Sequence, residues 1–205
     1  MKIQKLINEA YDQIYKIRHN LAYLYKFLIF VIPFLTIAFY FAFIFDYLPP
    51  EKEAKYSALT IAYLLPPAGK ESIIPLMLSE QVGPPLPVWI VWSTIIIMDV
   101  ISSAIIAYNW WFAEFIINHI PLLDKGYKIL QNKAEKFKKR KLLTISLLLF
   151  MIIPFQGTGG ISTTILSRLL GVRAKKTIAI VFTGSAITTT LWILWWLGFF
   201  AFLGI

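Results

Sequence analysis

The chain has 205 residues, of which 58% are hydrophobic and only 15% are charged, and its mean hydropathy is +0.68. Soluble domains are about 45–50% apolar and about 25% charged, so this composition excludes an ordinary soluble enzyme and indicates an integral membrane protein. The net charge of +9 does not require a nucleic-acid partner, because basic residues collect on the cytoplasmic side of membrane proteins. The lack of cysteine excludes disulfides, thiolate metal sites and cysteine catalysis.

The N-terminal part of the chain divides into two units. Residues 1–26 place charged and apolar side chains at a helical period and lack the apolar core of a signal peptide. We expect an amphipathic helix on the membrane surface or on the protein itself. Residues 27–56 begin with an apolar run from Phe27 to Phe45, long enough to span a bilayer. Pro33 predicts a kink in it, and the remainder of the unit is expected to be an outer loop.

Two further long apolar segments, residues 88–120 and 177–205, complete three predicted membrane spans. The first of them exceeds one perpendicular crossing, so it has to tilt, bend or emerge at the interface near Trp110.

Between the spans lie two broken apolar segments, residues 57–83 and 142–172. Neither half of either segment is long enough to cross a membrane. Helix breakers at membrane depth are tolerated only where the backbone is buried in protein or lines a wet cavity, which favours a re-entrant helical hairpin for each segment. The breakers are Pro66, Pro67 and Gly69 in the first segment, and Pro154 and Gly157–Gly160 in the second.

The distribution of basic residues favours this topology. Five Lys or Arg lie in residues 2–26, eight in residues 125–141 and three in residues 173–176. Three spans and two re-entrant hairpins place all three clusters on one side, the cytoplasm. We therefore expect a cytoplasmic N-terminus, a basic amphipathic cytoplasmic segment at residues 121–141, and a C-terminus outside the cell membrane.

A shift of 88 positions aligns the two broken segments, and a long span follows each. Residues 57–120 and 142–205 would then be inverted repeats, the plan of many secondary transporters, with a binding site near the bilayer midplane. The matched pairs are Pro66 and Pro154, Gly69 and Gly157, Ser79 and Ser167, Glu80 and Arg168, and Gly83 and Gly171.

The second broken segment carries a resemblance to a known family. The run Pro154-Phe155-Gln156-Gly157-Thr158-Gly159 and the later Leu169-Leu170-Gly171-Val172 resemble the signature of the small multidrug export family, which is related to the DedA (VTT-domain) membrane proteins. The stretch from Glu71 through Pro75 to Ser79-Glu80 is similar to the first re-entrant hairpin of DedA proteins. The resemblance covers residues from about 57 to 205.

This resemblance implies an all-α membrane fold with two opposed re-entrant hairpins and a role in transport. DedA relatives are implicated in moving lipids or lipid carriers, often with proton coupling. The chain departs from both families: Gly159 stands where DedA proteins usually carry an Arg, and Gly69 and Glu71 stand near positions that are acid and Arg in the small export family.

Ionisable groups inside a membrane are costly and are functional candidates by default. Glu71, at the predicted tip of the first hairpin, is the first candidate for proton coupling or for binding a substrate cation; the alternative is a structural ion pair with Lys70. Asp99, in the middle of the second span, is the second candidate and should face the protein interior. Glu80 and Arg168 either pair as a gate between the repeats or face water separately.

The hairpin tips complete the predicted site. Half-helix N-termini present free N–H groups and partial positive charge, and glycine lets the backbone approach a ligand closely. The tip residues predicted to line the site are Gly69, Gly157, Thr158, Gly159 and Gly160.

The sequence therefore predicts a transporter or exporter that moves a small molecule or amphiphile between two hairpin tips, with proton coupling as an option. The alternative is a flippase or scramblase for a lipid or lipid-carrier phosphate, and a scaffold without a substrate is a third option. No catalytic residue set, metal site or cofactor is expected. The expected partners are membrane lipids, the substrate, protons and a second copy of the chain, and not nucleic acid.

Overall fold

The computed structural model describes residues 2–65, 68–119, 128, 140–152, 159–198 and 202. Every regular element in this part of the chain is an α-helix. The predicted segment at residues 121–141 and the glycine run at Gly157 and Thr158 lie largely or wholly outside the described residues.

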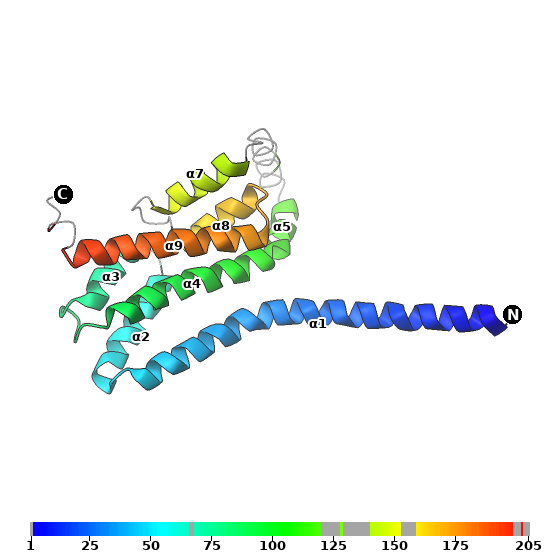
Figure 1. The fold of residues 1–205 in the computed structure, drawn as a ribbon, viewed down its shortest axis with the longest axis horizontal. Helices are drawn as coiled ribbons and strands as arrows, with labels where there is room; N and C mark the ends of the chain where they lie inside the picture. Colours follow the sequence, from blue (N-terminus) through cyan, green and yellow to red (C-terminus); the bar gives the residue numbers. More distant parts are fainter. Residues whose placement is uncertain are drawn as a thin grey trace.

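Helix α1, Lys2–Tyr47, is one continuous helix. It extends across the predicted boundary at residue 26, so the amphipathic segment and the first span are not separate elements. Pro33 lies inside α1, as expected for a kink, and the light-blue part of the helix bends in Figure 1.

Helix α2, Pro50–Leu64, corrects one expectation, because part of the predicted outer loop is helical. Pro50 occupies the first helical position, where its missing N–H costs nothing. Glu51 and Glu53 lie in the first turn, where negative charge favours the helix dipole. These start signals explain why the charged stretch folds as a helix.

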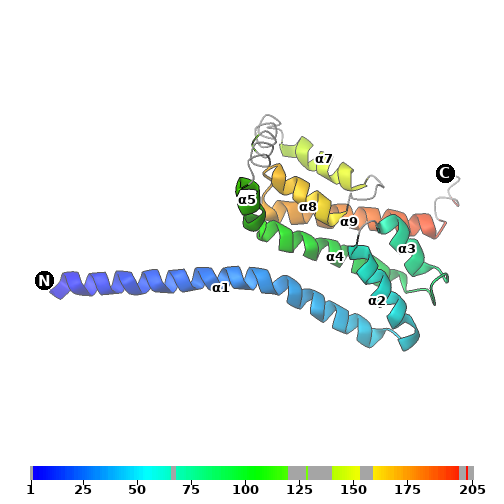
Figure 2. The same cartoon turned by 180° about the vertical axis from the view of Figure 1, so that it is seen from behind.

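Among the described residues, three helices are long and apolar enough to cross a membrane: His19–Tyr47 within α1, Val88–Tyr108 (α4) and Ala174–Trp196 (α9). The chain is accordingly a multi-pass membrane protein, and its described elements are all helices. In Figures 1 and 2, α4 and α9 lie side by side and antiparallel at the centre of the bundle, and α1 runs along α4.

The long segment predicted at residues 88–120 bends. Helix α4 ends at its C-cap Asn109, and a separate helix, α5, covers Trp110–His119. The backbone N–H and the side chain of Asn109 both donate to the Ile105 carbonyl (3.2 and 2.8 Å), so Asn109 closes the last turn of α4.

Each predicted broken segment is a pair of short helices. Helix α2 is followed by α3, Lys70–Leu78, and α7, Arg140–Ile152, is followed by α8, Gly160–Leu169. In Figure 1, α2 and α3 lie at the end of the bundle where α4 begins, whereas α7 and α8 lie toward the end where α9 begins. Both α3 and α8 contact α4 and α9.

The helix bounds repeat at the shift that aligns the sequence. Adding 88 to the bounds of α4 gives 176–196, and α9 covers 174–196. The same addition takes α2 to 138–152, against 140–152 for α7, and α3 to 158–166, against 160–169 for α8.

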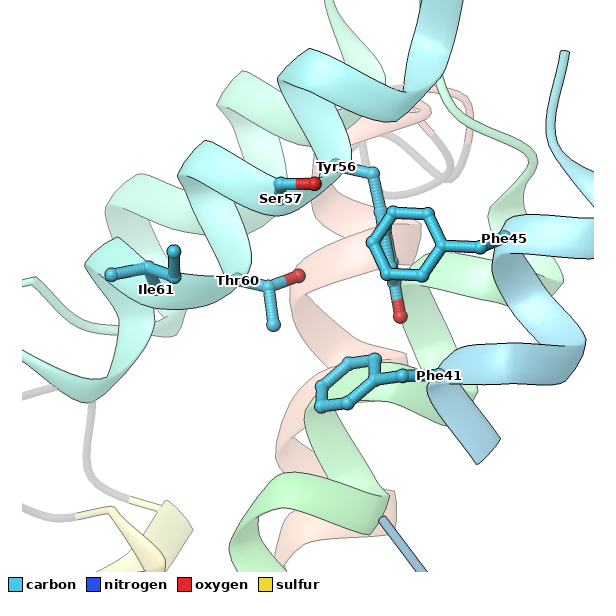
Figure 3. Close-up of a pocket in the computed structure, with 6 residues that line it drawn as sticks. All are labelled: Phe41, Phe45, Tyr56, Ser57, Thr60 and Ile61. Carbon is cyan, nitrogen blue, oxygen red and sulfur yellow. The ribbon is translucent and has the colours of Figure 1, made fainter. Parts of the chain in front are cut away.

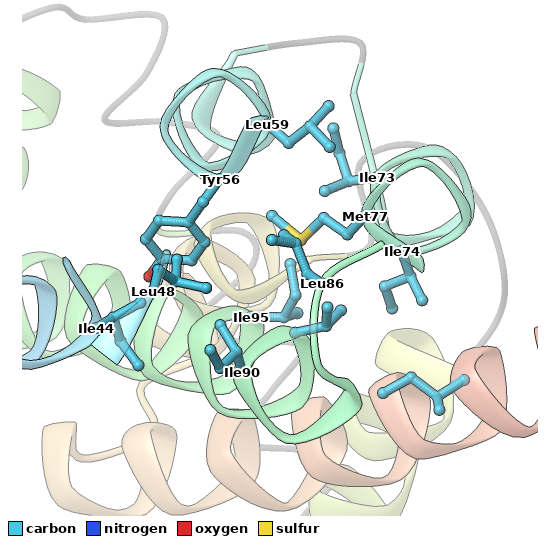
Figure 4. Close-up of a cluster of buried hydrophobic side chains, with 12 residues drawn as sticks. Ile44, Leu48, Tyr56, Leu59, Ile73, Ile74, Met77, Leu86, Ile90 and Ile95 are labelled. Carbon is cyan, nitrogen blue, oxygen red and sulfur yellow. The ribbon is translucent and has the colours of Figure 1, made fainter. Parts of the chain in front are cut away.

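The main apolar core joins α1, α2, α3 and α4 near the start of α4 (Figure 4). Ile44, Tyr56, Ile74 and Ile90 are fully buried in it. Inside a membrane, close packing of side chains rather than their removal from water holds helices together, so this cluster fixes the α2–α3 pair against α4.

Candidate functional site

A buried ion pair lies at the centre of the bundle. The Lys70 Nζ atom is 2.9 Å from Asp99 Oδ2, and the two side chains are only 8% and 5% exposed. Lys70 is the first residue of α3, and Asp99 lies in the middle of α4. Replacing a buried ion pair with apolar residues is often neutral or stabilising, so stability alone is a weak reason for a chain to hold these two charges.

Three further donors surround the Asp99 carboxylate. Tyr63 Oη donates to Oδ1 (2.8 Å) and Ser185 Oγ donates to Oδ2 (2.7 Å). The backbone N–H of Gly160 also donates to Oδ1 (3.3 Å). Side chains or backbone from α2, α3, α8 and α9 thus converge on one carboxylate of α4.

The Lys70 ammonium has a matching set of acceptors. Besides Asp99, it donates to Ser185 Oγ (2.9 Å) and to Thr188 Oγ1 (2.9 Å), both on α9. An ammonium has three donors, and each of them meets an oxygen here. The charges are therefore paired and hydrogen-bonded, the condition under which ionised groups are tolerated in a protein interior.

Helix α8 approaches α4 closely at this point. A Cβ added to Gly160 would lie 2.9 Å from Asp99 Cβ and 3.0 Å from its Cα, so only glycine permits the contact. One turn further along both helices, Thr164 Oγ1 donates to Ser103 Oγ (2.7 Å). The i, i+4 spacing on each helix keeps this polar face continuous.

Of the predicted tip residues, Gly160 reaches Asp99, and Gly159 is the N-cap of α8 with open space around its Cα. Gly69 is the N-cap of α3, and the Glu71 carboxylate folds back over it. The residues Gly157 and Thr158 lie outside the described part of the chain.

The alternative of a structural ion pair between Glu71 and Lys70 is not observed, because the Lys70 ammonium turns toward Asp99 and α9. The Glu71 side chain is partly exposed, and its buried Oε1 has no hydrogen-bond partner among the described residues. Glu71 is thus a carboxylate next to the ion pair in sequence but outside its hydrogen-bond network.

Glu80 and Arg168 belong to separate environments. Glu80 is exposed after the end of α3, whereas Arg168 donates to the Val172 carbonyl (2.7 Å) and lies over the Trp110 ring, 5.7 Å from its centroid. No ion pair joins the two in the part of the chain that the structure describes. Of the two alternatives for these residues, the gate is not formed among the described residues, and Arg168 instead closes the end of α8.

Sequence reasoning missed Lys70 as a site residue, together with Tyr63, Ser185 and Thr188. One signal was available: a lysine and an aspartate lie inside apolar segments, where each charged side chain needs a partner of opposite charge. The hydroxyls gave no distinct signal, because Ser and Thr also occur in membrane helices as packing residues.

Metal binding has no support among the described residues, where no group of three His, Cys, Asp or Glu lies close enough to hold an ion. The site is instead a compact, electrically neutral network of one ammonium, one carboxylate, three hydroxyls and one backbone amide.

The spans and this site define the class: a multi-pass α-helical membrane protein with a buried ion pair between its central helices. The chain belongs to the family described as "Putative small multi-drug export protein", whose model matches residues 72–191, more than half of the chain. That description names a transporter rather than an enzyme. Comparisons with curated proteins and with solved structures found no significant match.

Proposed function

We propose that the chain is a proton-coupled exporter of small molecules or amphiphiles, and that the Lys70–Asp99 pair is its coupling site. The observation that carries this proposal is the burial of both charges between two apolar helices that can cross a membrane. Ionisable groups in such positions mark ion pathways and proton relays by default.

The network suggests how a proton would be coupled to movement. Asp99 as a carboxylate accepts hydrogen bonds from α2, α8 and α9 and balances the charge of Lys70 on α3. A proton on Asp99 removes the negative charge, so the charge-assisted contacts weaken and Lys70 is left uncompensated. Protonation would therefore loosen the contacts of α3 and α8 with the two central helices.

Glu71 remains a proposed part of this route. Its partly exposed carboxylate adjoins Lys70 in the first turn of α3, so it can exchange protons with solvent more readily than the buried Asp99. We assign it the role of passing protons toward the site.

The helix bounds support the proposed topology. The repeat of 88 residues holds for three helices in each half, and the α2–α3 and α7–α8 pairs lie toward opposite ends of the bundle in Figure 1. Both features are expected of inverted re-entrant hairpins of the DedA type. The end of α5 and the starts of α7 and α9 lie at one end of the bundle, which we propose is cytoplasmic because basic segments flank them.

The second candidate, a translocator of lipid phosphate, fits the site less well. A phosphate would need the free N–H groups at the hairpin tips, but the Gly160 N–H already donates to Asp99. A carboxylate of the chain occupies the place that an anionic head group would take.

Transport by purified protein in proteoliposomes tests the proposal. Ethidium and tetraphenylphosphonium serve as soluble cation probes, and a fluorescent phospholipid serves for the lipid alternative. We expect a pH gradient to drive uptake of at least one soluble probe by the wild type, and Asp99→Asn to abolish it, because the amide cannot take up the coupling proton.

Ser102→Ala, one turn along α4 from Asp99 and with no bond to the ion pair, is the matched control and should transport normally. Uptake that ignores the pH gradient, or that survives both Asp99→Asn and Glu71→Gln, contradicts proton coupling at this site. Movement of the phospholipid alone supports the translocator instead.

A further inference from the structure

The first part of α1 takes no part in the proposed transport site. Helix α1 runs without a break from Lys2 to Tyr47, whereas its apolar span begins at His19. In Figures 1 and 2, the blue N-terminal part extends past the end of the bundle that holds α5. At 1.5 Å per residue, residues 2–18 reach about 25 Å beyond the span. A helix that continues a membrane span leaves the membrane in the direction of that span, which is not the course of a helix lying on the bilayer surface.

An apolar stripe with a heptad repeat runs along this part of α1. Apolar residues recur at alternating steps of four and three residues, the spacing of the a and d positions of a coiled coil. The charged, amide and histidine residues from Lys2 to Lys26 number twelve, and all of them lie off the stripe. More than three consecutive heptads of this kind are typical of a helix that packs along its length against another helix. The stripe comprises Ile3, Ile7, Ala10, Ile14, Ile17, Leu21 and Leu24.

The same repeat continues into the membrane span, where its side chains are open to the outside of the single chain. Exposed fractions of 42–58% are found at Leu21, Leu24, Leu28 and Leu35. Ala38 and Ala42 follow on the stripe and are also exposed. Small residues four apart let two membrane helices approach closely, so the stripe suits helix packing inside the membrane as well.

The bundle packs on the opposite side of α1. Pro33 and Ile44 are buried against it, and aromatic side chains of α1 line a groove against α2 (Figure 3). Leu35 and Ala42 each lie two residues from one of these buried positions, which is about 200° around the helix. A second helix can therefore occupy the stripe without displacing any contact of α1 with its own bundle.

Charge placement fits a second copy of the chain as that helix. In a parallel coiled coil, the residues at positions e and g, beside the stripe, select the partner through their charges. Of the seven charged residues in residues 2–26, six lie at positions c and f, and only Arg18 lies at e. Its counterpart at position g, Gln13, is uncharged. Identical helices therefore meet without like charges facing each other, and two copies inserted in the same direction present α1 parallel and in register.

The stripe also offers close to the area that a stable contact needs. A buried Leu or Ile side chain removes roughly 60–120 Å² from water. The six large side chains of the stripe in residues 2–26 then bury about 400–700 Å² per copy, against about 800 Å² per partner in a typical stable interface. The continuation of the stripe into the membrane supplies the remainder.

We propose that α1 binds α1 of a second copy of this chain as a parallel coiled coil, through the stripe from Ile3 to Ala42. The contact starts outside the membrane and continues along the span, on the side of α1 away from the bundle. It does not depend on what the chain transports.

Cysteine cross-linking tests the stripe position by position, since the chain has no cysteine of its own. Membranes from cells that express the full chain with one introduced cysteine are oxidised with copper phenanthroline. We expect a disulfide-linked dimer for Ile17→Cys and Ala42→Cys, both on the stripe. The adjacent controls Lys16→Cys and Phe43→Cys should give little dimer, because positions c and b face away from the partner helix.

A charge placed in the stripe tests the contact without a cross-link. Ile14→Lys puts an ammonium at an a position, where the two copies would bring like charges together. Asn8→Lys adds the same charge at a b position and is the matched control. Light scattering of the purified full chain in detergent measures its mass. We expect a dimer for the wild type and for Asn8→Lys, and a monomer for Ile14→Lys.

Equal linking of the stripe and control cysteines indicates random collisions and overturns the coiled coil. A monomeric wild type whose stripe cysteines do not link also overturns it, and leaves the stripe to a different protein or to the bilayer surface. Linking through Ile17→Cys but not through Ala42→Cys overturns the continuation into the membrane. None of these measurements uses a pH gradient or transport, so they can fail while the coupling role of Asp99 stands, and the reverse also holds.

Discussion

At the scale of single residues, the pairing of Lys70 with Asp99 determines how a substitution of either partner changes stability. Breaking a buried ion pair by removing one partner costs about 3–5 kcal/mol, whereas replacing both partners is often close to neutral. The contribution of the two charges to stability can therefore be separated from their contribution to transport, by comparing a variant that lacks one charge with a variant that lacks both.

We predict that Asp99→Asn lowers the free energy of unfolding by about 3–5 kcal/mol, because it leaves the Lys70 charge buried without its counter-ion. The double variant Lys70→Met with Asp99→Asn should recover most of this loss. Denaturant unfolding of the purified variants in detergent measures both values. A double variant that is stable but inactive in transport supports a functional pair; one that is as unstable as Asp99→Asn indicates a structural pair.

At the scale of elements, the packing of α8 on α4 depends on a single missing Cβ. Gly160 lies against the backbone and carboxylate of Asp99, whereas Gly159, its neighbour, has open space on that side. These two adjacent glycines thus differ in how they affect helix packing, although the sequence analysis assigned both of them to the lining of the site.

Gly160→Ala should force α8 away from α4, because its Cβ would lie 2.9 Å from Asp99 Oδ1. We expect a loss of about 1–3 kcal/mol, the usual cost of overpacking, together with loss of transport. Gly159→Ala is the matched control and should change neither quantity. Thermal unfolding and proteoliposome uptake are the measurements, and equal effects of the two substitutions would show that the close approach is unimportant.

At the scale of the whole molecule, the proposed topology places the ends of each short-helix pair on one side of the membrane. The chain lacks cysteine, so single introduced cysteines report accessibility without background. Glu51→Cys, in the first turn of α2, and Gln81→Cys, after α3, should react with a membrane-impermeant maleimide from outside. Arg140→Cys, at the start of α7, and Lys175→Cys, in the first turn of α9, should react only from the cytoplasmic side. Reaction of either pair from opposite sides contradicts the re-entrant arrangement.

Hydropathy was enough to predict three long apolar helices and the membrane class. The start of α2 was missed because its charged first turns resemble a loop, although Pro50 and two glutamates are start signals. Asp99 was placed correctly in the interior. Its pairing with Lys70 depends on how α3 packs between α4 and α9, and such contacts between elements are not encoded in local spacing.

The measurement that tests the central claim most directly is the distance between the two short-helix pairs as a function of pH. Spin labels at Gln81→Cys, beyond α3, and at Ile165→Cys, on the exposed face of α8, report it by pulsed electron resonance in nanodiscs. We predict that acidification shifts the distance distribution of the otherwise unaltered chain, and that adding Asp99→Asn produces the acidic distribution already at alkaline pH. A distribution that neither acid nor Asp99→Asn changes would contradict the claim that protonation of Asp99 releases α3 and α8.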